Sequence, residues 1–135
     1  MKMTGNELTG EIIRAAIEVH RELGGPGLLE DVYEEALCHE LQLRGLEVQR
    51  QILVPIEYKG KLLHKRLKLD LLVNGEIIVE VKSVDCYNDI FQAQLLTYLR
   101  LTNRNLGLVI NFGEKYVKDG VHRVVNNFPA LSASP

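Results

Sequence analysis

The segment from Leu69 to Ser83, LDLLVNGEIIVEVKS, restricts the possible folds more than any other part of the chain. Asn74-Gly75 separates two runs rich in aliphatic and β-branched residues, which predicts a β-hairpin. Apolar residues occupy odd positions on both sides of the turn: Leu67, Leu69, Leu71, Val73, Ile77, Val79 and Val81. A two-residue loop would pair odd with even positions and mix charged and apolar side chains on each face. We therefore expect a loop of odd length.

A three-residue loop, Val73-Asn74-Gly75, would place both apolar rows on one core face, with Gly75 in a left-handed bulge conformation. In that register Glu80 lies diagonally beside Asp70, roughly 7–8 Å away. Lys82 follows two residues later on the same face. Two interpretations stay open at this point: the three charges are the solvated side of a two-faced sheet, or they form one site.

The remaining pattern predicts an α/β, or α+β, domain with a mixed central β-sheet flanked by helices. Apolar residues recur at helical spacing in two N-terminal segments, which a Gly-Gly-Pro-Gly sequence separates. The predicted helices span residues 6–23, 29–44 and 88–101, and the predicted strands 47–58, 62–73, 76–83, 106–112 and 121–125. The run LGLVINF at 106–112 is apolar almost throughout, as expected for a strand covered on both faces.

Composition is typical of one soluble globular domain, since 46% of the 135 residues are hydrophobic and 25% are charged. We expect a single domain over 1–135, with a core at about 6–126 and a loose tail at 127–135. No apolar run approaches the roughly 18 residues that span a membrane, and the first ten residues lack the apolar core of a signal peptide. Cys38 and Cys86 have no metal-ligand spacing, so we expect reduced thiols and a cytoplasmic location.

A net charge of −2 excludes general attraction to polyanions as the main design. The segment KGKLLHKRLK is a local exception. Its cations are Lys59, Lys61, Lys65, Arg66 and Lys68. Either they keep a strand edge soluble and unpaired, or they contact the phosphates of a nucleic acid.

The pattern D-x9-E-x-K, formed by Asp70, Glu80 and Lys82, suits metal-assisted phosphodiester cleavage. Neighbouring carboxylates repel each other and stay ionised at low cost when they share a divalent cation. Magnesium prefers such oxygen ligands, and a nearby ammonium stabilises developing negative charge. On consecutive strands, these three residues resemble the core signature of the PD-(D/E)XK nuclease superfamily.

Two further motifs strengthen the resemblance. Gln94-Leu-Leu-Thr-Tyr98 resembles the Q-x-x-x-Y element of the exonuclease-like branch. Gly27-Leu-Leu-Glu30-Asp-Val-Tyr33 reads G-x-x-E-x-x-Y, the pattern of the GxxExxY proteins within this superfamily. The likeness extends from about Ile13 to Val125, with the motifs in the expected order.

The resemblance implies a single restriction-endonuclease-like domain that hydrolyses phosphodiester bonds of nucleic acid, with DNA the favoured substrate. Asp70, Glu80 and Glu30 would bind Mg²⁺ or Mn²⁺, and Lys82 would act on the attacking water. A buried Gln94 amide facing the sheet would orient the centre.

Supporting roles are expected for Gly27 at the entry to the second helix, for Tyr33 on the same helix face as Glu30, and for Tyr98 as a packing residue. His20 ends the first helix, where a structural role or a substrate contact is favoured over catalysis. The main alternative is a catalytically silent module that binds nucleic acid or protein on the same fold. A homodimer formed through an edge strand is also considered, and no membrane partner is expected.

Overall fold

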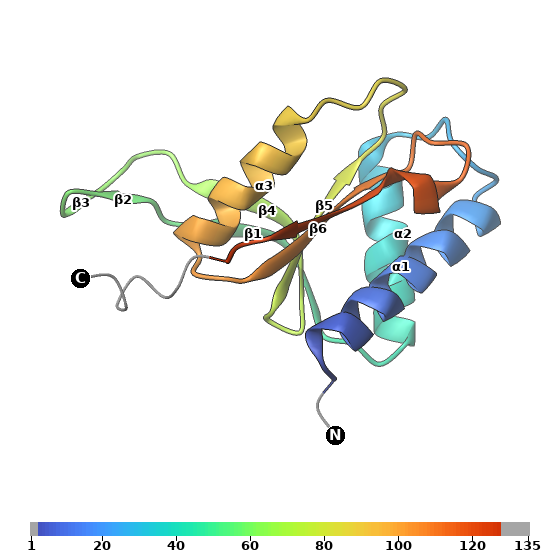
Figure 1. Ribbon diagram of the computed structural model, residues 1–135, viewed down its shortest axis with the longest axis horizontal. Helices are drawn as coiled ribbons and strands as arrows, with labels where there is room; N and C mark the ends of the chain where they lie inside the picture. The colour runs from blue at the N-terminus through green and yellow to red at the C-terminus, as the bar shows by residue number, and fades with distance from the viewer. Residues whose placement is uncertain (1–2, 128–135) are drawn as a thin grey trace.

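The computed structural model describes residues 3–127 of the chain (Figure 1). The helices are α1 (Gly5–Glu22), α2 (Glu30–Leu43), α3 (Ile90–Leu101) and the 3₁₀ helix η1 (Val117–Gly120). The strands are β1 (Val48–Val54), β2 (Glu57–Tyr58), β3 (Lys61–Leu62), β4 (Leu67–Val73), β5 (Ile77–Lys82), β6 (Leu106–Asn111) and β7 (Val121–Val125). The tail predicted at 127–135 lies, apart from its first residue, outside the described residues.

Five strands form one sheet in the order β1-β4-β5-β6-β7, and β2 pairs with β3 in a separate two-stranded sheet. Only β5 and β6 are parallel, because α3 connects them by a crossover; the other neighbours are antiparallel. Helices α1 and α2 cover one face of the sheet and α3 covers the other (Figure 1). The predicted mixed sheet flanked by helices is confirmed.

Strand β6 is buried on both faces, which explains its nearly continuous apolar sequence. Leu108 and Ile110 belong to the core beneath α1 and α2, whereas Val109 belongs to the core beneath α3. Gly107 lies beneath α3 as well, and a Cβ there would come within 2.9 Å of the Leu95 side chain.

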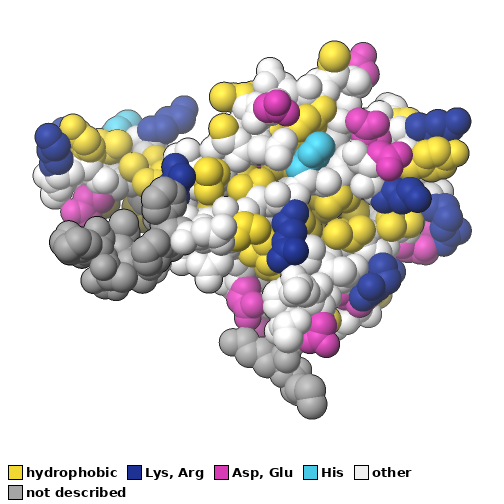
Figure 2. Space-filling view, in the orientation of Figure 1, with side chains coloured by type: hydrophobic (Ala, Val, Ile, Leu, Met, Phe, Trp, Pro, Cys, Tyr) yellow, Lys and Arg dark blue, Asp and Glu magenta, His cyan; other side chains and the backbone are white. Residues whose placement is uncertain are grey.

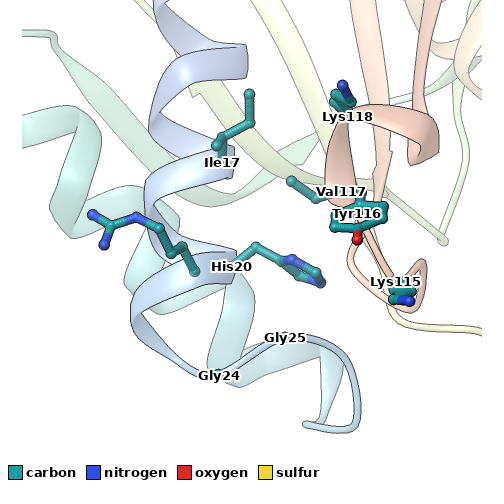
Figure 3. Close-up of a pocket in the computed structure, with 9 residues that line it drawn as sticks. Ile17, His20, Gly24, Gly25, Lys115, Tyr116, Val117 and Lys118 are labelled. Atoms are coloured by element: carbon teal, nitrogen blue, oxygen red, sulfur yellow. The ribbon is translucent and has the colours of Figure 1, made fainter.

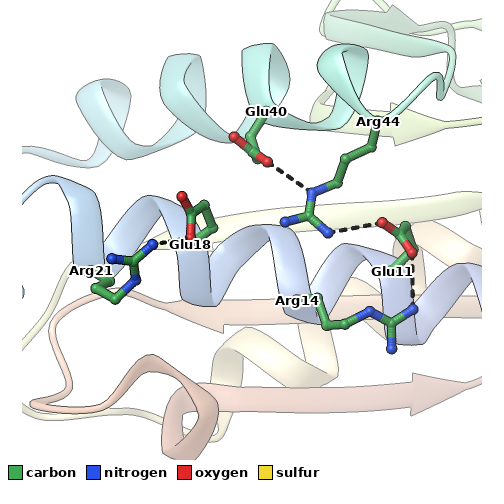
Figure 4. A network of polar contacts seen from close by, with 6 residues as sticks. All are labelled: Glu11, Arg14, Glu18, Arg21, Glu40 and Arg44. Carbon is green, nitrogen blue, oxygen red and sulfur yellow. Dashed lines mark hydrogen bonds and ion pairs between the residues drawn. The ribbon is translucent and has the colours of Figure 1, made fainter.

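Arg44 ties the two N-terminal helices together (Figure 4). Its guanidinium donates hydrogen bonds of 2.8 Å to Glu40 of α2 and to Glu11 of α1. Arg14 donates to the other oxygen of Glu11, at 2.9 Å. Helix α2 is therefore fixed against α1 at its C-terminal end, while its N-terminal end remains exposed at Glu30.

The loop between β4 and β5 has the predicted length of three residues but begins one residue later than expected. Val73 pairs with Ile77, so the loop is Asn74-Gly75-Glu76 and not Val73-Asn74-Gly75. Asn74 and Gly75 are both left-handed, with φ of 52° and 68°. Asn accepts this conformation at little cost, which lets the strand continue through Val73. Leu71 pairs with Val79, so one residue further from the loop Asp70 lies opposite Glu80. A diagonal arrangement was predicted.

Strands β1 and β4 change face together where Gln51 lies opposite Asp70. Val48, Leu71 and Val73 pack in the core beneath α1 and α2. Ile52, Val54, Leu67 and Leu69 pack in the core beneath α3. The prediction that Leu67, Leu69, Leu71 and Val73 form one apolar row is therefore wrong. The left-handed φ of Gln51, 56°, reverses the alternation of side chains at this point.

Residues 57–66 form a projecting arm built on the β2–β3 hairpin (Figure 1). Every one of these residues is exposed. Figure 2 shows dark-blue cationic and yellow hydrophobic side chains mixed over the arm. Two long strands were predicted at 47–58 and 62–73; each is interrupted where the chain leaves the main sheet.

Candidate active site

Asp70 and Glu80 are joined by hydrogen bonds between each side chain and the opposite strand. The Asp70 backbone N–H donates to Glu80 Oε2 at 3.0 Å, and the Val81 N–H donates to Asp70 Oδ2 at 2.9 Å. The two carboxylates therefore lie side by side, held by rigid strands in the middle of the sheet. This geometry places them next to each other, and their role in one site stays a prediction.

Burial gives both carboxyl groups an unusual proton affinity. Burial raises the pKa of Asp70 to about 6, and the charges of Glu34 and Glu30 add to the effect. Burial, followed by the charge of Asp70, raises the pKa of Glu80 to about 8. Glu80 is only 6% exposed, so it does not belong to a solvated sheet face. Perturbed carboxyls in such a pair are typical of functional sites.

A hollow of about 560 Å³ opens beside Asp70, where β4 meets the N-terminal turn of α2. Its lining includes Glu30, Glu34 and Lys68. Glu30 is exposed at this hollow, and its charge raises the pKa of Asp70. Glu30 and Asp70 therefore line the same hollow.

Glu34 is a site residue that the motif comparison missed. It is 4% exposed, and its Oε2 accepts hydrogen bonds from Arg50 Nε at 2.8 Å and from Gln51 Nε2 at 2.7 Å. It follows Glu30 by four residues, so the two side chains share one helix face. The four-residue spacing from Glu30 could have indicated Glu34 from the sequence, but the G-x-x-E-x-x-Y motif points to Tyr33 instead.

Lys82 and Tyr98 flank the carboxylates on the side of α3. Lys82 is half-buried, its Nζ lies 4.6 Å from the centre of the Phe91 ring, and its charge lowers the pKa of both Asp70 and Glu80. Burial raises the pKa of Tyr98, and the charges of Glu80 and Asp70 raise it further. Both residues therefore lie near the acidic pair, although Tyr98 was expected only as a packing residue.

Gln94 does not have the buried position expected from helical spacing. It is exposed, whereas Leu95 and Leu99 form the buried stripe of α3. The buried residues of α3 are those that face β6, and they are not the residues of the Q-x-x-x-Y motif. The predicted burial of Gln94 is therefore wrong.

Tyr33 is directed into the protein core and not toward the carboxylates. Its ring stacks on Phe112 at 4.6 Å, and its hydroxyl donates to the Gly25 carbonyl at 2.6 Å. The same oxygen accepts from the Leu28 N–H at 3.1 Å. Gly27 has φ of 115°, which strongly favours glycine. Both residues thus shape the loop that carries Glu30, and Tyr33 does not share its face.

His20 is buried against the Phe112 carbonyl, which lies 3.1 Å from Nε2 and accepts a hydrogen bond from it. Its ring points from α1 toward residues 115–118, across a hollow of about 510 Å³ (Figure 3). None of the acidic residues described above lines this hollow. The geometry agrees with a structural role for His20.

The donor set of Asp70 and Glu80 suits a hard divalent cation. Both provide carboxylate oxygens, and a cation between them would relieve the repulsion that raises their pKa values. Within residues 3–127, no group of three or more His, Cys, Asp or Glu side chains is arranged to hold a metal ion. Glu30 therefore remains at the hollow and does not complete a three-carboxylate group in this structure. The predicted third ligand stays a prediction.

A mixed five-stranded sheet with adjacent Asp and Glu carboxylates and a following lysine defines the class of restriction-endonuclease-like domains. A family model, the PD-(D/E)XK nuclease superfamily, matches residues 6–124. The chain belongs to this superfamily. No curated protein and no solved structure matches the chain significantly. Within the described residues, no helix is long and apolar enough to span a membrane.

Proposed function

We propose that the chain is a divalent-metal-dependent nuclease of the GxxExxY type, which hydrolyses phosphodiester bonds of DNA with Mg²⁺ or Mn²⁺. One observation carries the proposal: the half-buried Asp70 and the buried Glu80 lie side by side, with Lys82 close to both. Two like charges withdrawn from water are costly in a structural role, whereas a metal centre makes use of them.

Asp70 and Glu80 would hold the metal, with Glu30 as a further oxygen ligand reaching from the helix end. A bound divalent cation would supply charge neutralisation at the phosphate and a more acidic water. Lys82 is half-buried and carries an ammonium group, so it would orient the attacking water or stabilise negative charge on the phosphate. Gln94, exposed at the neighbouring helix, would contact the substrate or this water. Tyr98 and the loop shaped by Gly27 and Tyr33 support these groups.

The cations of the arm favour a polyanionic substrate. Lys59, Lys61, Lys65 and Arg66 are all exposed, and Lys68 continues the series to the hollow beside Asp70. A strip of lysines and arginines that leads to the carboxylates would offset their repulsion of the phosphate backbone. The sheet has two edge strands, β1 and β7, and a homodimer would pair the chains through one of these edges.

A nuclease assay tests the proposal directly. The native protein is incubated with single-stranded and duplex DNA and with RNA, in Mg²⁺ or Mn²⁺, beside Glu80→Ala and Lys82→Ala. We expect DNA cleavage by the native protein and its loss in both variants. Gln49→Ala, an exposed substitution on β1, is the matched control and should cleave normally. Cleavage that survives both site substitutions would rule out this mechanism.

The alternative is a silent module that binds nucleic acid or protein on the same fold. A titration with Mn²⁺, followed by calorimetry, separates the two functions. A nuclease should bind the ion with an affinity that Glu80→Ala abolishes, and a silent module should show no such carboxylate-dependent site.

A further inference from the structure

Glu34 links helix α2 to strand β1 next to the acidic pair. Its Oε2 alone accepts both the Arg50 Nε–H, at 2.8 Å, and the Gln51 amide, at 2.7 Å. Glu34 is itself 4% exposed, and these two donors, which come from exposed residues at the rim of the hollow, offset its negative charge. Two adjacent residues of β1 are thus fixed to one buried atom of the helix.

Gln51 has the conformation that changes the direction of the strand. Its φ of 56° is unfavourable for a residue with a side chain, and it persists only where neighbouring groups hold it. Regular pairs flank it, Arg50 with Leu71 and Ile52 with Leu69, but residues 51 and 70 form no regular pair. The interruption of the ladder therefore coincides with Asp70.

The interruption coincides with a change in how Asp70 bonds to its neighbours. Its backbone N–H donates to Glu80 Oε2, and its own Oδ2 accepts the Val81 N–H. At this position the apolar side chains of β1 and β4 change from the core beneath α1 and α2 to the core beneath α3. The kink at Gln51 and the pairing of the carboxylates are parts of one local distortion.

We propose that Glu34 and Gln51 are positioning residues for Asp70. The buried Glu34 carboxylate holds the Gln51 amide, and the left-handed kink maintained by this bond turns Asp70 toward Glu80. The kinetic part of this proposal rests on the proposed nuclease function, whereas its structural part does not.

Substitutions of Gln51 separate the side-chain bond from the backbone conformation. Gln51→Ala removes the amide and disfavours the left-handed φ, whereas Gln51→Gly removes only the amide and tolerates that φ. Glu34→Ala removes the acceptor. Gln49→Ala serves as the matched control, because Gln49 is an exposed glutamine of the same strand. Circular dichroism of each variant checks that it folds.

Two readouts are measured on the full chain. The first is the ¹⁵N–¹H signals of the Asp70 and Val81 amides, which report the carboxylate pairing without metal or substrate. We expect both signals to move in all three test variants and to stay in place in Gln49→Ala. The second is cleavage kinetics. There we expect kcat to fall on the order of 10²-fold with KM nearly unchanged, as for a misplaced catalytic group.

Three results would overturn the positioning role. The first is that the Asp70 and Val81 signals keep their native positions in Gln51→Gly, and the second is that they keep them in all variants. The third is that the signal changes of Glu34→Ala and Gln51→Gly add fully in the double variant, because the effects of removing two partners of one bond should not be additive. If the native protein cleaves no nucleic acid, the nuclease function fails and the two amide signals alone decide the positioning role.

Discussion

The hairpins β4–β5 and β2–β3 each turn through two consecutive left-handed residues, in loops of three and two residues, but they lie in opposite environments. Asn74 and Gly75 have φ of 52° and 68°, and Lys59 and Gly60 have φ of 48° and 84°. The first hairpin lies in the middle of the main sheet, where helices cover both faces. The second belongs to the arm, where every residue from 57 to 66 is exposed.

This difference shows that turn residues determine where a hairpin forms, whereas the flanking residues determine what it can do. In the buried hairpin, low polarity makes each carboxylate expensive to ionise, so a pair of them favours a cation. In the exposed hairpin, lysines cost little and act at a distance on a polyanion. The experiments below test this contrast, from the largest expected effect to the smallest.

The largest effect is expected for the charges of the buried hairpin. Glu80→Gln preserves size and removes the negative charge, and we expect DNA cleavage to fall by about 10³-fold or more, because the proposed metal ligand is lost. Glu76→Gln makes the same chemical change at the loop of the same hairpin and should leave cleavage within about twofold of native. Equal loss in the two variants, measured by initial rates at saturating Mg²⁺, would show that the buried pair has no special role.

The next effect concerns stability and compares one leucine in each hairpin. Leu72 of β4 is 6% exposed and Leu62 of β3 is 66% exposed. Leu72→Ala should reduce the free energy of unfolding by about 3 kcal/mol, since it leaves a cavity in the core beneath α3. Leu62→Ala should change it by less than about 0.5 kcal/mol. Urea denaturation measures both, and a large loss for Leu62→Ala would mean that the arm contributes to the fold.

Much of this contrast could be predicted from the sequence. The odd-numbered apolar positions next to the turn, which do share one core, indicated a three-residue loop and predicted that Asp70 lies near Glu80, because alternation is a local property of strands. Leu67 and Leu69, further from the turn, enter the other core. The continuous run at 106–112 likewise predicted a strand covered on both faces. The order of helices and strands also followed from local patterns.

The remaining features depend on tertiary contacts that no local pattern encodes. The face switch requires Gln51 to be left-handed, and this conformation is held by Glu34 from a distant helix. The exposure of Gln94 depends on which side of α3 meets β6. Helical spacing predicted that Glu30 and Tyr33 share one face. In the structure Tyr33 packs in the hydrophobic core, whereas Glu34 lines the same hollow as Asp70.

The third effect is a pH dependence of stability that only the buried hairpin should produce. The pKa of Glu80 is raised to about 8 and that of Asp70 to about 6, so the folded protein binds more protons than the unfolded chain above the ordinary carboxyl range. Stability should therefore fall as pH rises from about 4 to about 8. Thermal melts in EDTA should show Tm decreasing across this window in the native protein and much less in Glu80→Gln. Added Mn²⁺ should restore Tm most at the upper end, because ionised carboxylates bind it best.

The smallest effect is expected from the charges of the arm. Lys59→Gln with Lys61→Gln removes two exposed cations, and we expect the Kd for duplex DNA in EDTA to rise about tenfold. The slope of log Kd against log salt should become shallower by about 2, one counterion for each lost phosphate contact. Lys115→Gln with Lys118→Gln makes the same charge change beside the hollow of Figure 3, away from the arm, and is the matched control. If the two double variants weaken binding equally, as measured by fluorescence anisotropy, net charge and not the arm attracts the DNA. If only the arm variant loses affinity for DNA and its kcat is unchanged, the β2–β3 hairpin binds the substrate and the β4–β5 hairpin carries the catalytic groups.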